Sequence, residues 1–125
     1  MFHVEPTRLV QVVLRQCATM TLRRLDIHDF RCIQSAELEF DRRCNLISGA
    51  NASGKTSLLE AVYFLGRGRS FRTARTEALI RENTHELLVA ARMDGTGGSL
   101  RPMGIRYSRD GFEAKVAGTR VSSLA

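Results

Sequence analysis

Apolar and polar residues alternate in two segments that follow residue 20 of the chain. In residues 36–40 every second position is apolar and the positions between are glutamates, and residues 22–30 show a looser form of the same alternation. Because successive side chains of a β-strand point to opposite faces, this period of two predicts strands with one face in water. Residues 44–47 form a third, short and mostly apolar strand that leads into Gly49.

A different pattern begins after Gly54, because residues 57–65 contain no helix breaker before Gly66. Apolar residues occupy most sides of this segment, which predicts a buried helix that ends at Gly66. Strand-like segments then return at residues 86–93, 104–108 and 112–117. Between the last two, Asp110-Gly111 is typical of a β-hairpin turn. The chain therefore combines a first group of strands, one helix and a second group of strands.

Residues 1–19 do not share this pattern. A few apolar residues fall at helical spacing and permit a short amphipathic helix, but the apolar run is too short for a signal peptide. We interpret residues 1–19 as a leader that a native start at Met20 does not include, and residues 20–125 as the domain. No closing element follows the segment that begins at residue 119, so we expect the N-terminal portion of a longer protein.

Residues 49–56 match the phosphate-binding loop G-x-x-x-x-G-K-[ST] without deviation. The motif lies between a predicted strand and a predicted helix, as this loop requires. Its glycines allow a sharp turn and a close approach of the backbone to phosphate, while successive N–H groups form an anion nest at the helix N-terminus. The predicted phosphate-binding residues are Gly49, Ala50, Asn51, Ala52, Ser53, Gly54, Lys55 and Thr56.

Two side chains of this motif have specific roles. Lys55 is expected to reach the β- and γ-phosphates, and the Thr56 hydroxyl to be a ligand of Mg²⁺. Hydrolysis also needs an Asp or Glu after four apolar residues on a second strand, and the chain contains no such stretch. Glu60, on the predicted helix, is interpreted as structural. The sequence therefore predicts nucleotide binding but assigns no catalytic residue, and whether the chain is an enzyme stays open.

The balance of charge fits an anionic partner. The chain has 19 lysines and arginines against 13 acids, and every base except Lys55 and Lys115 is an arginine. Arginine forms planar, bidentate contacts with phosphate, although a general bias towards arginine explains the same composition. No apolar run is long enough to span a membrane. Three widely spaced cysteines without a C-x-x-C pair are typical of reduced thiols in a cytoplasmic protein.

The run LDIHDFR at residues 25–31 and the run GANASGKTSLLEAVYFLGRGRSFR at residues 49–72 resemble the N-terminus of the RecF family. These proteins are bacterial recombination and repair ATPases with a head like that of structural-maintenance-of-chromosomes (SMC) proteins. The resemblance covers residues 20–125 and departs from the family pattern at Cys32-Ile33 and at Ala52. It implies the α/β class: the N-terminal part of an ABC/SMC-type P-loop ATPase head, with a mixed sheet and the P-loop helix.

The resemblance also implies a function. It suggests an ATP-binding and DNA-binding protein of recombinational repair and replication-fork maintenance, cytoplasmic and active in the SOS response. The family binds single-stranded and junction DNA, works with RecO and RecR, forms ATP-dependent homodimers and is a weak DNA-dependent ATPase. The acid and signature motif for hydrolysis would lie after Ala125. Two alternatives stay open, an inactive truncated fragment and a small-molecule P-loop kinase, which would need a lid soon after the helix.

Arginines are concentrated in residues 66–81, which contain five of them and one glutamate. Related chromosome ATPases have an arginine loop in this region, so the resemblance suggests that Arg69 and Arg72 contact DNA phosphates. Contacts with the nucleotide or between lobes of the head, and a passive basic surface, stay open as alternatives. Phe71 either stacks on a base or, as is more common, anchors the segment in the core. Arg31 is a further candidate for a position near the nucleotide.

Overall fold

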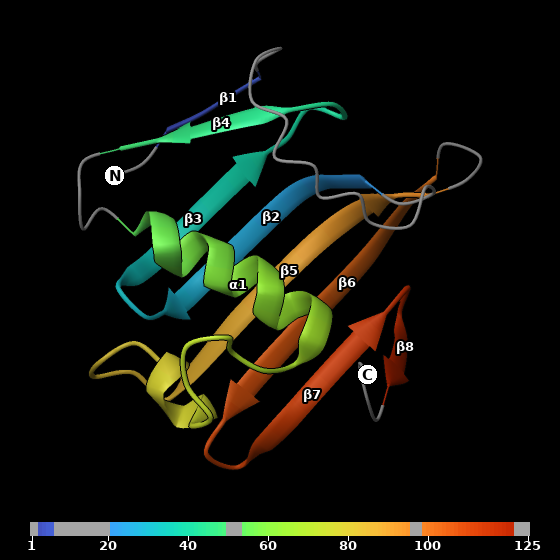
Figure 1. Cartoon of the computed structure of the whole chain (residues 1–125). Coiled ribbons are helices and arrows are strands. Elements are labelled where there is room, and N and C mark those ends of the chain that lie inside the picture. Colours follow the sequence, from blue (N-terminus) through green and yellow to red (C-terminus); the bar gives the residue numbers. More distant parts are fainter. Residues whose placement is uncertain (1–2, 7–20, 50–53, 96–98, 122–125) are drawn as a thin grey trace.

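The computed structural model describes residues 3–6, 21–49, 54–95 and 99–121 of the chain. Within these ranges the chain forms β-strands, one α-helix and one short 3₁₀ helix, η1 (Figure 1). The elements in chain order are β1 (His3–Pro6), β2 (Thr21–Phe30), β3 (Ile33–Glu39), β4 (Asn45–Ser48), α1 (Lys55–Arg67), η1 (Thr76–Leu79), β5 (Glu86–Asp94), β6 (Leu100–Ser108), β7 (Gly111–Val116) and β8 (Thr119–Val121).

Six of these strands form one antiparallel sheet in the order β3-β2-β5-β6-β7-β8. Strand β2 lies between β3 and β5, so Ile27 pairs with Ala36 on one side and with Val89 on the other. Strands β1 and β4 pair separately as a two-stranded antiparallel sheet. Strand β1 lies within residues 1–19, the segment predicted as a leader. Every pairing among the described strands is antiparallel, so the parallel strands of a mixed sheet are not among them.

Helix α1 crosses one face of the six-stranded sheet and contacts β2 and β5 (Figure 1). Alternation along β2 and β5 turns their apolar side chains towards the helix, as the period of two predicts. The rings of Phe30 and Phe64 pack against each other with centroids 5.9 Å apart. The fully buried side chains of this core include Leu25, Ile27, Phe30, Leu58, Ala61, Phe64, Leu79, Leu87, Val89 and Ile105.

The predicted helix is present, but its predicted end is wrong. Helix α1 continues past Gly66 to Arg67. The residue that ends it is Gly68, which takes the left-handed conformation (φ 69°) and donates its N–H to the carbonyl of Phe64 at 2.7 Å. Glycine adopts this conformation without the strain that a Cβ would cause, which makes it a common residue after the last helical turn.

The second group of strands is also present, with two differences from the prediction. Strand β6 starts at Leu100, four residues before the predicted start, and pairs along its whole length with β5. The hairpin between β6 and β7 has Arg109 and Asp110 as its turn residues, because Ser108 pairs with Gly111. The apolar alternation is weak in the first part of β6, so pairing with β5 rather than the local pattern determines where this strand begins.

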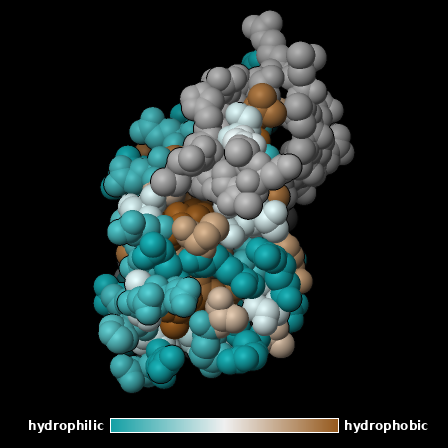
Figure 2. All heavy atoms as spheres, turned by 90° about the vertical axis from the view of Figure 1, so that its left-hand side faces the viewer, coloured by the Kyte–Doolittle hydropathy of each residue, from teal (hydrophilic) through white to brown (hydrophobic). Residues whose placement is uncertain are grey.

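One face of the molecule shows how polar and apolar side chains are distributed. On the face at the left-hand side of Figure 1, polar residues predominate and a hydrophobic area lies near the middle (Figure 2). No helix in the described part of the chain is long and apolar enough to cross a membrane.

Candidate phosphate-binding site

The predicted phosphate loop connects the end of β4 to the start of α1 (Figure 1). Its two ends, Gly49 and Gly54, are described, whereas Ala50, Asn51, Ala52 and Ser53 lie outside the described residues. Gly54 has φ 101° and ψ 12°, in the left-handed region that favours glycine. A residue with a Cβ would be strained at this position, which gives a backbone reason for the second glycine of the motif.

Lys55 joins the two ends of the loop. Its ammonium Nζ donates a hydrogen bond to the carbonyl oxygen of Gly49 at 2.7 Å. This contact requires β4 and the start of α1 to face each other across the loop, as the motif predicts. It also keeps a positive charge beside Gly49, at the start of the loop, where a phosphate group would be attracted to it.

The N-terminus of α1 offers further hydrogen-bond donors. The N–H of Leu58 is the first that donates to a helical carbonyl, that of Gly54 at 2.8 Å. No side chain caps this end of the helix, and its first turn contains no acidic residue. The first N–H groups of a helix have no acceptor within the helix itself, so this end, with the positive end of the helix dipole, favours an anion.

Thr56 lies beside Lys55 in the first turn of α1, and its side chain is exposed. Within the described ranges, no group of three or more His, Cys, Asp or Glu residues could hold a metal ion. In nucleotide sites Mg²⁺ is usually bound by one or two side chains together with phosphate oxygens, not by a cage of protein ligands. An exposed hydroxyl at the start of α1 fits that arrangement.

Glu60 is the one fully buried ionisable side chain in the described part of the core. Arg31 donates two hydrogen bonds to it, from Nε to Oε1 at 2.8 Å and from Nη2 to Oε2 at 3.1 Å. Ser70 Oγ donates to Oε2 at 2.5 Å, and Arg72 Nη1 lies 3.6 Å from Oε1. We predicted a position near the nucleotide for Arg31, and in the structure its guanidinium binds Glu60. The lone acid in an apolar helix was the signal for this cluster, but its partners were not identified.

Two opposing effects act on the pKa of the Glu60 carboxyl. Burial raises the pKa, because it disfavours the charged form. Hydrogen bonds from Arg31 and Ser70, together with the positive charges of Arg31 and Arg72, lower it, and the net result is a pKa below the ordinary value. Glu60 is therefore an ionised carboxylate that its partners keep charged inside the protein.

The arginine-rich segment, residues 66–81, is held at both ends. It begins at the C-terminal end of α1, where Gly68 caps the helix. At its other end the backbone of Ile80 forms a bridge to Phe30, with an N–H from Arg31 to the carbonyl of Leu79 at 2.8 Å. The side chain of Leu79 is fully buried in the core. The segment between these points is therefore a fixed loop on the surface of the domain.

The arginine-rich segment leaves α1 at the end opposite the phosphate loop, but it turns back along the helix, so that Ser70 and Arg72 reach Glu60. The helix has 13 residues, which separates its ends by about 18 Å along the axis. Arg69 is exposed and has no ion-pair partner in the part of the chain that the structure describes, whereas Arg72 pairs with Glu60. Phe71 is half exposed, and its ring packs edge to face on Tyr63 with centroids 5.3 Å apart. It contacts the surface of α1 and not the core.

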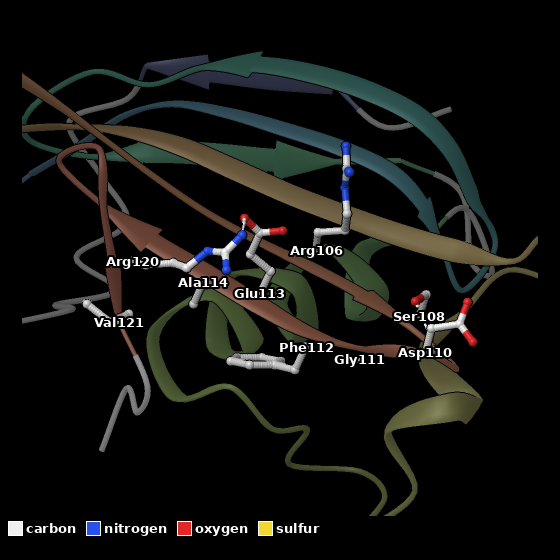
Figure 3. A pocket seen from close by; sticks show the side chains of 9 residues that line it. All are labelled: Arg106, Ser108, Asp110, Gly111, Phe112, Glu113, Ala114, Arg120 and Val121. Carbon is white, nitrogen blue, oxygen red and sulfur yellow. Dashed lines mark hydrogen bonds and ion pairs between the residues drawn. The ribbon is translucent and has the colours of Figure 1, made fainter.

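A shallow hollow of about 300 Å³ lies away from these residues, on β6, β7 and β8 (Figure 3). The guanidinium of Arg120 points at Glu113, with 3.1 Å between Nη2 and Oε1, and Lys115 also contacts Glu113. Arg106 extends away from that pair. Because two acids, Asp110 and Glu113, line this hollow together with two arginines and give it no net positive charge, we assign the phosphate site to the loop and not to this hollow.

The sequence matches the family described as the RecF/RecN/SMC N terminal domain over residues 21–99. The DNA replication and repair protein RecF of Psychromonas ingrahamii is 42% identical over 107 residues, and that of Shewanella amazonensis is 45% identical over 107 residues. Each comparison covers 85% of this chain but only 30% and 29% of the relative. The chain therefore spans about 30% of the length of these relatives.

Solved structures show the same fold. The structure described as that of the recombination mediator protein RecF-ATP in the RecFOR pathway has a TM-score of 0.73 at 26% identity, covering 85% of this chain and 30% of that one. A structure from a study of ATP-driven dimerization and DNA-stimulated activation of SMC ATPases has a TM-score of 0.72, covering 82% of this chain and 72% of that one. At 21% identity it shows the fold alone. The family match and the RecF likeness confirm the prediction that this chain has the fold of the N-terminal part of an SMC-type ATPase head.

Proposed function

Because the chain belongs to the RecF/RecN/SMC N-terminal domain family, we propose that residues 49–56 bind the phosphates of ATP. Lys55 contacts the β- and γ-phosphates, and the backbone N–H groups of the loop surround them. The Thr56 hydroxyl is a ligand of Mg²⁺, which neutralises phosphate charge when bound.

One observation supports this proposal above the others. The ammonium of Lys55 lies over the loop on the carbonyl of Gly49, next to a helix N-terminus that no side chain caps. A positive charge, the N-terminus of a helix and two glycines of the motif thus lie close together at the described ends of the loop. This combination attracts a compact anion with several oxygens, as a triphosphate is.

We further propose that this chain acts in recombinational DNA repair and replication, in the cytoplasm, as part of a protein that dimerises when ATP is bound. The names of its relatives and the ATP complex in the RecFOR pathway support this role. RecO and RecR are the partners that the resemblance suggests. The family match leaves the small-molecule kinase without support.

Arg69 and Arg72 are the proposed contacts for single-stranded or junction DNA. Both guanidiniums lie at the surface of the arginine-rich segment. One guanidinium can bind two oxygens of the same phosphate at once. Such contacts recognise the DNA backbone and not the bases. Arg69 has no competing acid among the described residues, so it is the stronger candidate of the two.

The replacement Lys55→Ala tests the nucleotide site. It removes a charge-assisted contact to phosphate, so we expect ATP affinity to fall by about 1.5–3 kcal/mol, which is roughly ten- to a hundredfold in Kd. Isothermal titration with ATP and Mg²⁺ measures the change. Lys115→Ala is the matched control, because it removes the other lysine of the chain from an exposed position on β7. Equal ATP affinity in the two variants would contradict the assignment.

A further inference from the structure

Three side chains contact the carboxylate of Glu60, inside the domain. Arg31 donates two hydrogen bonds to its carboxylate, Ser70 donates a third, and Arg72 adds an ion pair. Glu60 follows Thr56 by one helical turn, which is about 6 Å along the axis of α1. The carboxylate therefore lies close to the nucleotide end of the helix, while two of its partners belong to the arginine-rich segment.

Ser70 fastens the backbone of that segment to the carboxylate. Its hydroxyl donates to Glu60 at 2.5 Å and accepts the N–H groups of Arg72 at 2.8 Å and Thr73 at 3.3 Å. A serine hydroxyl has one donor and two acceptor positions, so all of its hydrogen-bonding capacity is used here. The Ser70 hydroxyl thus connects the carboxylate on α1 to two backbone N–H groups of the segment, alongside the Arg72–Glu60 ion pair and the ring contact of Phe71 with Tyr63.

The three partners of Glu60 differ in how closely they contact its carboxylate. Arg31 and Ser70 make short contacts and occupy both carboxylate oxygens. Arg72 is farther away, at 3.6 Å, and 40% of its side chain is exposed. If Arg72 turned to an external phosphate, Glu60 would still be paired and hydrogen bonded, so no unpaired charge would be left in the core.

We propose that Glu60 is a positioning residue for DNA binding. Through Ser70 it attaches the arginine-rich segment to the helix of the phosphate loop. It also keeps Arg72 at the surface, where the guanidinium can leave Glu60 and bind a DNA phosphate. This inference rests on the proposed contact between the segment and DNA. Because α1 is a continuous helix, a movement of Lys55 and Thr56 is passed directly to Glu60, and from there to the segment.

The first experiment needs no DNA. Amide hydrogen exchange is measured at Arg72 and Thr73 in the parent, Ser70→Ala and Ser70→Thr. We expect exchange at both amides to accelerate about fivefold in Ser70→Ala, because their acceptor is gone, and to stay near the parent rate in Ser70→Thr, which keeps a hydroxyl. Glu77→Gln is the control, since it changes an exposed carboxylate of the same segment. Unchanged exchange in Ser70→Ala overturns the proposal.

The second experiment measures binding of a labelled single-stranded oligonucleotide at several salt concentrations. We expect Ser70→Ala to lower DNA affinity about fivefold with an unchanged salt slope, because the arginines remain but are no longer fixed. A contact residue behaves differently, since its loss flattens the slope. Glu60→Gln is expected to show a smaller effect of the same kind, because a neutral acceptor binds the hydroxyl less strongly. If Glu60→Gln does not fold, the DNA affinity and salt slope of Ser70→Ala are sufficient to test the proposal.

The results distinguish a failure of the positioning role from a failure of the proposed DNA contact. Parent-like DNA binding in Ser70→Ala, with weakened binding in Arg69→Ala, overturns the positioning role and leaves the proposed DNA contact in place. Parent-like binding in both variants overturns the proposed DNA contact and this role with it. Weakened binding at constant salt slope in Ser70→Ala, restored by Ser70→Thr, supports the proposal.

Discussion

Lys55 and Glu60 lie five positions apart on α1, and their surroundings are opposite. Lys55 is partly exposed and contacts a backbone carbonyl of the loop, so its charge stays available to a ligand. Glu60 is fully buried, and its charge is used by partners within the protein. In the proposed site, the Lys55 side of the helix would face an external anion, while Glu60 connects segments inside the protein.

Thr56 provides the first prediction at this scale. Thr56→Ser keeps the hydroxyl and should retain the Mg²⁺ dependence of ATP binding, whereas Thr56→Val keeps the shape but loses the metal ligand. We expect Thr56→Val to weaken Mg²⁺-dependent ATP binding by about 1–3 kcal/mol. ATP titrations with Mg²⁺ and with EDTA measure the effect. If serine and valine show the same Mg²⁺ dependence as threonine, Thr56 is not a metal ligand.

Glu60 gives a prediction about pH. Its pKa is lower in the folded protein than the ordinary value of 4.5, so its ionised form adds stability that is complete above that value and is lost as the pH falls through the lowered pKa. Glu60→Gln cannot titrate. Urea unfolding between about pH 3 and pH 7 should therefore show the stability difference between parent and variant shrinking at the acid end. A difference that stays constant over this range would argue against an ionised, paired Glu60.

The sequence predicts contiguous features of the site well and distant pairs poorly. Gly49, Gly54, Lys55 and Thr56 belong to one short motif, so their placement follows from local backbone geometry. Arg31 and Glu60 are 29 positions apart, and their contact depends on how α1 packs over the turn after β2. No local pattern contains that information.

At the scale of elements, helix α1 shows where pattern alone is insufficient. Its apolar composition predicted a helix buried on all sides, but Leu59 is 56% exposed on the side turned away from the sheet. Two glycines near its end, Gly66 and Gly68, are equivalent as sequence signals. Only the backbone conformation shows that the second one ends the helix.

These two glycines allow a paired test. A Cβ at Gly66 would meet nothing within 4 Å, so Gly66→Ala should stabilise the protein by about 0.5–1 kcal/mol through better helix propensity. Gly68 has φ 69°, so Gly68→Ala should destabilise it by about 1–2 kcal/mol. Urea unfolding compares the two with the parent. Effects of the same sign would contradict the observed helix end.

At the scale of the whole molecule, α1 lies between the phosphate loop and the arginine-rich segment. The phosphate loop lies at its N-terminal end and the arginine-rich segment at its C-terminal end, while the sheet supports the helix between them (Figure 1). Strands β2 and β3 were predictable from their period of two, whereas β1 and the first part of β6 were not. The order of strands in the sheet was not, because it brings β5 beside β2 across an intervening helix.

The arrangement predicts different results for Arg69→Ala and Arg72→Ala. Each variant should weaken binding to all DNA sequences alike, and each should flatten the plot of log affinity against log salt by about 0.7 for a single strand. Arg69→Ala should leave stability unchanged, because Arg69 has no ion-pair partner in the described ranges. Arg72→Ala should also lower stability slightly, by about 1 kcal/mol or less, since Glu60 keeps Arg31 and Ser70.

Fluorescence anisotropy with a single-stranded oligonucleotide over a range of salt concentrations measures both slopes, and ATP affinity without DNA should barely change in either variant. Arg92→Ala is the control, because it removes an equal charge from an exposed position on β5. A general loss of positive charge would lower affinity in the control as well. If the slopes of Arg69→Ala and Arg72→Ala equal that of the parent, these arginines do not contact phosphate, and the basic segment serves only to support the fold.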